Sequence, residues 1–265
     1  MTRHRYARAA LYLCLVALIA GCAAQPAARK DPRDPWEGVN RVTQKFNDGF
    51  EDAIALPVGH AYQNVAPHWL QIGIGNFMDN IQYPITVVND LLQAKFKTFA
   101  NDTGRFVFNS TFGLAGLLDP ATEVGLAKNQ NDMGRTLGTW GLPPGPYFVI
   151  PVLGPSDVRD AVGKIPDGYY LAPSAYIKSW QWSLGFYAVY GVDLSARYLI
   201  PTEDTLKQVN PYDRYAFIRN AWLQRREYLI HGGATQKSED ESEQELLKEL
   251  NEDESSSSPT TPPKK

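Results

Sequence analysis

The sequence is poor in the residues that build covalent cross-links and metal sites. Its 265 residues include only two cysteines, Cys14 and Cys22, and both lie close to the N-terminus. The rest of the chain can therefore form neither a disulfide nor a thiolate metal site. The histidines also lack the spacing of a zinc motif such as His-Glu-x-x-His. They are His4, His60, His68 and His231. We expect neither a metal nor any other cofactor.

Short catalytic motifs are missing as well. There is no Gly-x-Ser-x-Gly elbow, and Gly73 and Gly75 lack the third glycine and the preceding strand of a dinucleotide fingerprint. Asp157 and Asp160 can share one face of a helix. Acids near a helix N-terminus cap and stabilise it far more often than they transfer protons. The sequence therefore predicts a protein that is not an enzyme.

Long apolar runs are also absent. The uncharged stretch from Ala9 to Ala20 is shorter than the about 20 residues that a transmembrane helix needs. It follows Arg3, Arg5 and Arg8. A basic segment followed by a short apolar segment is typical of a secretory signal peptide. We predict that residues 1–21 are such a signal.

The signal ends at Cys22 in the residues Leu-Ile-Ala-Gly-Cys. This segment resembles the lipobox of bacterial lipoproteins, in which the cysteine carries acyl chains such as palmitate. Several chains would hold the protein durably at a membrane, because each buried CH2 contributes about 0.8 kcal/mol. Ala23, in place of an aspartate after the cysteine, favours the outer membrane, with the protein facing the periplasm. Residues 22–33 are expected to be a flexible tether.

The charge of the chain is unevenly distributed. Its 26 basic and 29 acidic residues give a net charge of -3, and most of the acidic excess lies beyond residue 236. The body is nearly neutral, so nothing favours binding to nucleic acid. We expect residues 236–265, acidic and then rich in serine and proline, to be a disordered tail.

Residues 34–235 have the periodicity of several short amphipathic helices. A first helix is expected to begin with Asp34 as N-cap and Pro35 at its first position, and a link from Leu56 to Pro67 follows it. The apolar stripes have spacings of three and four residues. They consist of Val39, Val42, Phe46 and Phe50, then Leu70, Ile74, Phe77 and Ile81, then Val87, Val88, Leu91 and Leu92.

Further helices are expected at residues 96–112, at 173–200 and from Pro211 to a Gly-Gly C-cap at 232–233. Tyr147 to Ile150 can form a strand, which a small hairpin could include, and Ser156 is the expected N-cap of the helix that follows. The fold class is mainly all-α. Periodicity alone favours a soluble core, although such helices can also lie in the plane of a membrane.

Several motifs of this body resemble the MlaA family of outer-membrane phospholipid-transport lipoproteins, also called VacJ. Gly138-Thr139-Trp140-Gly141 leads to a glycine- and proline-rich segment, and Pro211-Tyr212 precedes Gln224-Arg225-Arg226. The family usually has an aspartate where this chain has Asn210. The remaining motif positions, for which we expect a structural role, are Asn40, Arg41, Asn76, Phe77, Gly145, Pro146, Tyr147, Pro151, Gly154, Pro155, Ser156, Arg159 and Asp160.

The resemblance implies a ring-like arrangement of short helices that lie in the membrane plane around an amphipathic channel. It also implies a non-enzymatic role in lipid asymmetry. Phospholipids mislocalised to the outer leaflet would be removed and passed to a soluble periplasmic carrier, beside outer-membrane porin trimers. Arg225 and Arg226 are candidates for contact with lipid headgroups, whereas snorkelling or a surface salt bridge is the more common role of such arginines.

Two other hypotheses stay open at this point. The chain could be a porin-associated scaffold with an indirect effect on lipids, which bound phospholipid in the purified protein would contradict. It could also be a hydrolase, which requires a nucleophile and a base within hydrogen-bond reach.

Overall fold

The structure is a computed structural model that describes residues 31–231. The predicted signal peptide, Cys22 and the acidic tail lie outside the described residues. Within them the chain is mainly helical. Its helices are α2 (Glu37–Phe50), α3 (Leu56–Val65), α4 (His68–Asn80), α5 (Tyr83–Leu92), α6 (Phe96–Phe112), α7 (Pro120–Glu123), α8 (Met133–Thr139), α9 (Val158–Pro166), α10 (Trp180–Leu194), α11 (Ile200–Val209) and α12 (Arg214–His231).

Three π-helical turns join or extend these helices. They are η1 (Glu51–Ala55) between α2 and α3, η2 (Asp167–Leu171) after α9, and η4 (Ser195–Leu199) between α10 and α11. A proline lies at the junction each time: Pro57 and Pro201 begin the following helix, and Pro166 ends the preceding one. Because proline has no N–H to donate, a widened turn keeps the helix running past it. A short 3-10 helix, η3 (Pro173–Tyr176), precedes α10.

The expectation that residues 56–67 form an irregular link is wrong, because most of this segment is α3. Pro57 stands at the start of the helix, where its missing N–H costs nothing. Gly59 permits a close packing contact, since a Cβ there would lie 2.5 Å from the Oγ atom of Ser195. That hydroxyl donates a 2.6 Å hydrogen bond to the carbonyl of Ala55.

Helix starts differ from the sequence prediction in two places. Asp34 is not the N-cap of α2; Trp36 holds that position and makes no capping hydrogen bond through its side chain. Ser156 does not cap α9, because the Asp157 carboxylate accepts the hydrogen bond from the Asp160 amide at 2.7 Å. The predicted capping role of the acids near this helix start is confirmed for Asp157.

The expected hairpin is present. Strands β1 (Tyr147–Ile150) and β2 (Gly154–Asp157) pair antiparallel, with Tyr147 opposite Asp157 and Ile150 opposite Gly154. Gly154 has a φ of +80°, a backbone conformation that a glycine adopts without strain at the turn.

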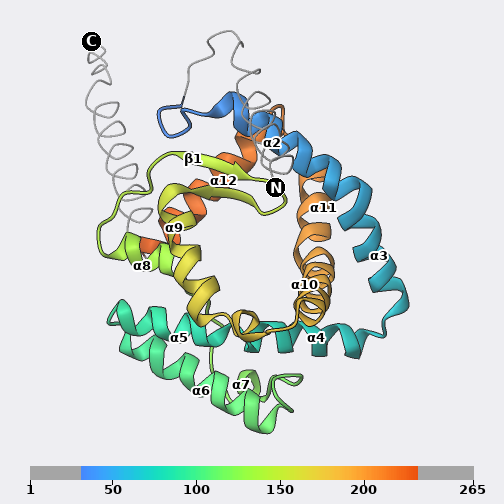
Figure 1. Cartoon of the computed structure of the whole chain (residues 1–265), viewed down its shortest axis with the longest axis vertical. Coiled ribbons are helices and arrows are strands. Elements are labelled where there is room, and N and C mark those ends of the chain that lie inside the picture. The colour runs from blue at the N-terminus through green and yellow to red at the C-terminus, as the bar shows by residue number, and fades with distance from the viewer. Residues whose placement is uncertain (1–30, 232–265) are drawn as a thin grey trace, which may run out of the picture. The chain divides into compact units, whose positions relative to one another are not determined.

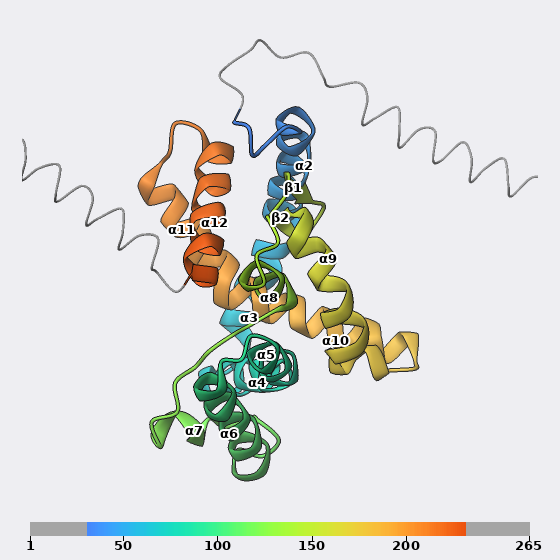
Figure 2. The same cartoon turned by 90° about the vertical axis from the view of Figure 1, so that its left-hand side faces the viewer.

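The chain divides into two compact units, one ending at Arg219 and one beginning at Asn220, within α12. In the first unit the packing contacts close a circuit (Figure 1). The circuit passes from α2 through α3, α10, α4, α6 and α5 to α8 and α9, and returns to α2 through the hairpin. Helix α6 packs against α5 and carries α7 beside it (Figures 1 and 2).

The prediction of a mainly α-helical fold with a small hairpin is thus confirmed. None of the helices between residues 31 and 231 has both the length and the hydropathy of a membrane span.

Candidate functional site: a polar interior behind apolar surfaces

The faces of α2 are reversed relative to those of a helix in a water-soluble domain. Its apolar stripe points outward, and 56% of Phe46 is exposed. The buried residues of the helix are instead Asn40, Gln44 and Asn47. The expectation of a soluble core formed by the apolar stripes is therefore wrong for this helix.

The same reversal holds in α5 and α6. The buried residues of α5 are Tyr83, Thr86, Asn89 and Asp90, whereas Leu91 and Leu92 are exposed. In α6 the buried residues are Asp102, Arg105 and Asn109, and Phe96, Val107 and Phe112 are exposed. Among the described residues, polar and charged side chains outnumber hydrophobic ones in the interior.

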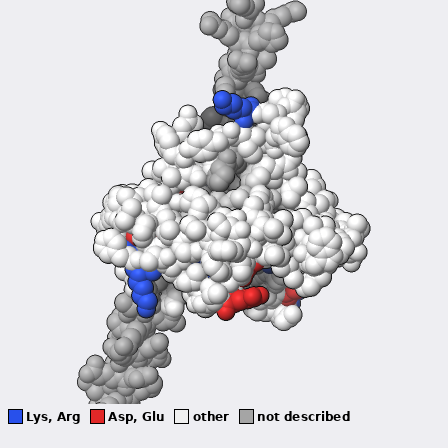
Figure 3. Space-filling model, turned by 90° about the horizontal axis from the view of Figure 1, so that it is seen from below, with Lys and Arg blue, Asp and Glu red and all other residues white. Residues whose placement is uncertain are grey.

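The outer surface is apolar, as the polar interior of these helices leads one to expect. Figure 3 shows the face on the side of α6 and α7, and only small parts of it carry acidic or basic residues. Large apolar side chains are exposed on most of the helices of the first unit. Helix α10 adds aromatic rings, with Trp180 and Trp182 both more than 70% exposed. Exposed apolar area of this extent marks a surface that contacts another apolar phase or partner.

Two buried asparagines on α2 fasten the hairpin. The Nδ2 atom of Asn40 donates to the carbonyl of Tyr147 at 3.2 Å, and its Oδ1 atom accepts from the Val149 amide at 3.1 Å. Two helical turns later, Asn47 donates to the carbonyl of Ile150 and accepts from the amide of Val152. Each asparagine thus supplies the donor and the acceptor that a neighbouring strand would have offered to β1.

Asp34 is the centre of a buried polar cluster. Its carboxylate accepts hydrogen bonds from Asn40 at 2.8 Å, from the Tyr215 hydroxyl at 2.5 Å and from Arg219 at 3.0 Å. Burial, followed by the hydrogen bond to Asp34, raises the pKa of Tyr215 above its ordinary value. The phenol therefore stays protonated and remains a donor.

Arg105 is the most deeply buried cation of a second network. Its side chain is 1% exposed and forms a forked pair with Asp119, with bonds of 2.7 and 2.9 Å from Nη2 to the two carboxylate oxygens. Nε donates to the Tyr83 hydroxyl at 2.7 Å, and Nη1 donates to Thr122 and to the Leu126 carbonyl. The guanidinium thus has a partner at each nitrogen, which compensates for its burial.

The Asp119 carboxylate is held equally firmly. It caps α7 by accepting from the amide and the hydroxyl of Thr122, and it also accepts from Asn109 at 2.9 Å. These hydrogen bonds and the Arg105 charge outweigh the desolvation of the carboxyl and lower its pKa to about 2. Asp119 is therefore ionised at any physiological pH.

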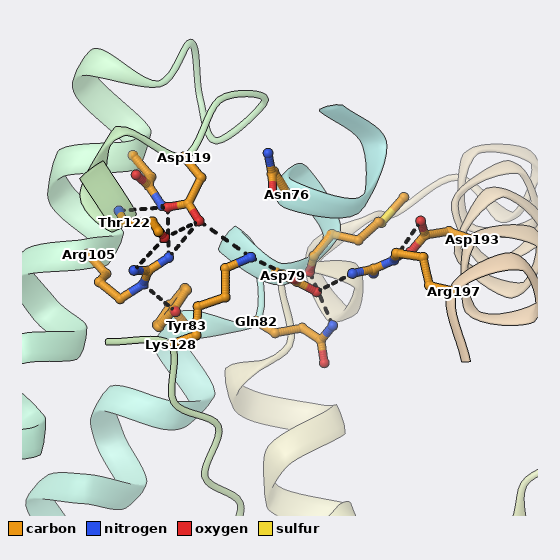
Figure 4. A network of polar contacts seen from close by, with 12 residues as sticks. Asn76, Asp79, Gln82, Tyr83, Arg105, Asp119, Thr122, Lys128, Asp193 and Arg197 are labelled. Atoms are coloured by element: carbon orange, nitrogen blue, oxygen red, sulfur yellow. Dashed lines mark hydrogen bonds and ion pairs between the residues drawn. The ribbon is translucent and has the colours of Figure 1, made fainter. Parts of the chain in front are cut away.

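A second acid, Asp79, continues the network towards η4 (Figure 4). Its Oδ1 atom accepts from Nη1 of Arg197 at 3.0 Å, and Arg197 also pairs with Asp193. Gly75 leaves space for this arginine, because a Cβ there would lie 3.1 Å from the Arg197 Cδ atom. Lys128 reaches between the two acids, 3.4 Å from Asp119 and 3.9 Å from Asp79. The negative charges of Asp79, Asp119 and Asp193 are then balanced by the positive charges of Arg105, Arg197 and Lys128.

A pocket opens beside this network. It has about 180 Å³ of empty volume, counting the part that is open to solvent. Its walls are Asn76, Asp79, Tyr83, Arg105, Asn109, Asp119 and Lys128. No group of three or more metal-ligating side chains within residues 31–231 is arranged to hold a metal ion.

A pair of acids lies nearer the other end of α5. Asp90 and Asp102 are both fully buried, and their carboxyl groups are within hydrogen-bonding reach of each other. Burial raises the pKa of Asp90 to about 6, with the hydrogen bond to Asp102 as the next cause. The Oδ1 atom of Asp90 accepts from Asn131 at 2.7 Å, whereas Oδ2 has no hydrogen-bond donor.

The structure gathers most of the predicted motif residues at two places. Asn40, Pro146, Tyr147, Pro155 and Ser156 lie at or beside the hairpin, where Tyr147 and Ser156 are buried. Pro151 lies in its turn, and Gly154 begins β2 directly after the turn. Gly145 precedes β1 with a φ of +70° and would place a Cβ 3.2 Å from Val158.

Arg159 and Asp160 lie at the start of α9 and are both buried. The Arg159 guanidinium lies 3.5 Å from Asp160 and 3.4 Å from Asp157. Arg41 bridges Glu37 and Asp213 instead. These contacts agree with the predicted structural role of the positions, which stays a prediction.

The remaining predicted residues lie elsewhere. Asn76 lines the pocket, and Phe77, one position further along α4, is partly exposed. Arg225 and Arg226 belong to the second unit, where Arg225 is exposed and Arg226 partly buried. Their predicted contact with headgroups stays a prediction, as does the lipidation of Cys22.

Sequence reasoning missed the network around Asp79, Asp119 and Lys128. One signal was present: Arg105 is the only charged residue between Gly104 and Leu118. A lone cation in an apolar stretch requires a buried anion, although its position in the sequence does not say which one.

Comparisons with known proteins agree with this architecture. A family model described as MlaA lipoprotein matches residues 32–229. A protein of Escherichia coli named "Intermembrane phospholipid transport system lipoprotein MlaA" is 30% identical over 88% of this chain and 92% of its own length. The protein of the same name in Haemophilus influenzae is 28% identical over 88% of this chain and 94% of its own length. An uncharacterized protein of Rickettsia bellii is 33% identical over 74% of this chain and 76% of its own length.

A solved structure reported as "Structural basis for maintenance of bacterial outer membrane lipid asymmetry" has a similar fold. The TM-score is 0.66 at 32% sequence identity, and the match covers 74% of this chain and 98% of the solved one. The chain belongs to the MlaA lipoprotein family. The resemblance that the motifs indicated is thereby confirmed.

Proposed function

We propose that this chain is an outer-membrane lipoprotein that lies within the bilayer and conducts phospholipids past the hydrocarbon layer. The reversed helix faces are the observation that carries the proposal. Apolar side chains such as Phe46 and Phe112 point outward, and polar ones such as Asn47 and Arg105 point inward.

The energetics of the two environments support this placement. In water, an exposed Phe or Leu forgoes about 1.5–3 kcal/mol relative to its buried state. In hydrocarbon the same surface costs nothing, whereas each unsatisfied polar group costs several kcal/mol. Most of the buried polar groups of α2, α5 and α6 have hydrogen-bond partners within the protein, and each helix satisfies its own backbone. Such helices can lie in the plane of a membrane without spanning it.

The inward-facing polar groups suit a phospholipid headgroup. A charged headgroup crosses hydrocarbon only at great cost unless polar groups or water line its path. Because relatives carry the name of an intermembrane phospholipid transport lipoprotein, we infer that the lipid is a phospholipid. In this proposal it is mislocalised in the outer leaflet and is passed to a soluble periplasmic carrier, which maintains lipid asymmetry.

Two further parts of the proposal concern attachment and partners. Acyl chains on Cys22 would tether the body, and Arg225 and Arg226 would contact lipid phosphates. The exposed apolar faces would also suit the lipid-facing wall of a porin trimer.

The decisive experiment measures phospholipid in the outer leaflet of the native host after deletion of the gene. We expect outer-leaflet phospholipid to rise in the deletion strain and to return to the parental amount when the gene is restored. The Cys22→Ser form should restore it poorly, because it lacks the acyl anchor. Unchanged outer-leaflet phospholipid in the deletion strain would overturn the proposal.

A second measurement tests the placement in the bilayer. Tryptophan fluorescence of the reconstituted protein should be quenched by lipids brominated along their acyl chains, because Trp180 and Trp182 would lie against them. Quenching no stronger than that of a soluble protein mixed with the same vesicles would contradict the placement. Phospholipid that stays bound during purification would separate a conduit from a scaffold with an indirect effect.

A further inference from the structure

The pocket between α4 and α7 has the composition of a receptor for a primary ammonium group. One such group already occupies it: Nζ of Lys128 lies 3.4 Å from Oδ2 of Asp119 and 3.9 Å from Oδ2 of Asp79. The lysine side chain is 54% exposed, and the two carboxylates are 14% and 20% exposed. A flexible cation thus lies in a place built by two mostly buried acids.

The two acids are fixed independently of Lys128. Arg105, Thr122 and Asn109 hold Asp119 through hydrogen bonds of 2.6–2.9 Å. Arg197 holds Asp79 at 3.0 Å. Figure 4 shows these contacts of the two acids. Removal of the lysine would therefore leave both carboxylates in position.

The lysine itself is held weakly. Its distances to the acids exceed the about 2.7–2.9 Å of a charge-assisted hydrogen bond. An ion pair to a half-exposed lysine contributes little, because water screens the ammonium and the long side chain loses freedom. An ammonium from another molecule can therefore compete for the same place.

Charge balance restricts what that molecule can be. With Lys128 in place, the acids Asp79, Asp119 and Asp193 balance the cations Arg105, Arg197 and Lys128. Without it, the site has one uncompensated negative charge. A monovalent ammonium restores neutrality, whereas an anionic headgroup without an amine does not.

We propose that this pocket is a subsite for the ethanolamine headgroup of a zwitterionic phospholipid. The lipid ammonium would replace that of Lys128 between Asp79 and Asp119, and Lys128 would turn to the lipid phosphate. After the exchange every charge has a partner of opposite sign, so the desolvation cost of each charge stays compensated. This inference rests on the proposed function and adds a headgroup preference to it.

The test uses the full-length protein in detergent, titrated with short-chain phosphatidylethanolamine or phosphatidylglycerol. We expect the ethanolamine lipid to bind about three- to tenfold more tightly than the glycerol lipid. Asp79→Asn keeps the shape of the side chain and removes the charge, so it should abolish this preference. Asp204→Asn on the exposed surface of α11 is the matched control and should preserve it.

A second variant tests the role of Lys128 and does not depend on lipid. The probe is methylammonium, which offers an ammonium without a phosphate. Lys128→Met removes the internal competitor and should bind methylammonium at least about threefold more tightly than the unaltered protein does. The double variant Lys128→Met, Asp79→Asn should lose that gain. Circular dichroism establishes that each variant is folded.

The outcomes separate the subsite from the proposed function. Equal affinity for the two lipids in the unaltered protein, or a preference that survives Asp79→Asn, would overturn the subsite and leave lipid conduction intact. No increase in methylammonium binding by Lys128→Met would also overturn it. If the unaltered protein bound neither lipid, the proposed function would fail together with the subsite.

Discussion

The carboxyl groups of Asp90 and Asp102 face each other within hydrogen-bonding reach, and both side chains are fully buried. Asn101 and Asn129 donate to the two oxygens of Asp102, at 2.8 and 3.0 Å. Only Oδ2 of Asp90 has no hydrogen-bond donor. Burial is the main cause of the raised pKa of Asp90, and the hydrogen bond to Asp102 is the next. A proton between the two acids would satisfy the unpaired oxygen.

The pair should make stability fall as pH rises. The pKa of Asp90 increases from 3.8 in the unfolded chain to about 6 in the fold. Between these values the folded state binds more protons than the unfolded state, so the free energy of unfolding decreases as pH rises. Lys95 opposes the effect through its charge, but burial and Asp102 outweigh it.

We therefore expect Asp90→Asn to stabilise the protein by roughly 1–3 kcal/mol at pH 7.5 and by clearly less at pH 4.5. An asparagine reproduces the protonated acid, since its oxygen can accept from Asn131 and its amide can donate to Asp102. Thermal unfolding from pH 4.5 to 7.5 measures this. If the variant kept the same decline with pH as the unaltered protein, the shared proton would be disproved.

Arg105 should be among the most sensitive positions of the fold. Arg105→Met leaves the Asp119 carboxylate without its forked partner and should lower the free energy of unfolding by about 3–5 kcal/mol. Arg105→Lys keeps the charge but loses the hydrogen bonds that Nε and Nη1 donate to Tyr83 and Thr122, and we expect an intermediate effect. Chemical denaturation in detergent measures both.

Arg33→Met is the comparison for this prediction, because Arg33 pairs with Asp31 at the surface with 57% of its side chain exposed. Its effect should stay within about 1 kcal/mol. Similar effects at Arg105 and Arg33 would mean that the buried network contributes no more than a surface pair.

Two glycines in different surroundings give opposite expectations. A Cβ at Gly163 on α9 would lie 2.9 Å from the Cα of Gly134 and closer still to its amide nitrogen. Because the obstacle is backbone, Gly163→Ala must push α8 and α9 apart and should cost about 2 kcal/mol or more.

Gly185 on α10 has no atom within 4 Å of such a Cβ. Gly185→Ala should stabilise that helix by about 0.5–1 kcal/mol. Melting temperatures of the two variants measure the contrast, and a loss at Gly185 equal to that at Gly163 would contradict it.

The exposed apolar faces predict membrane binding without the acyl anchor. The Cys22→Ser form should still sediment with phospholipid vesicles. Phe46→Asp or Trp69→Asp should weaken this binding about tenfold, since each removes one large apolar side chain from the contact. Phe46→Leu, which keeps the surface apolar, is the control. If both aspartate variants bound vesicles as tightly as the control, these faces would not be the lipid-contacting surface.

Much of the architecture follows from local sequence. The spacing of Val39, Val42 and Phe46 marks α2, and Tyr147 to Ile150 is the first strand of the hairpin as expected. The segment from Leu56 to Pro67 was wrongly predicted to be a link, because a proline and a glycine usually interrupt a helix. Here Pro57 begins α3, and Gly59 allows it to pack against Ser195. Only the position of that distant serine gives the glycine its role.

The sequence by itself determined that the helices have two faces, that they are too short to span a bilayer, and which family they belong to. It did not determine which face is buried. A period of 3.6 residues separates apolar from polar side chains equally well in a soluble core and in a lipid-facing surface. Only the tertiary structure decided that Asn47 points inward and Phe46 outward. It also brought Asp79, Asp119 and Lys128 together, because long-range packing of separate helices, and no local spacing, sets the distances between their charges.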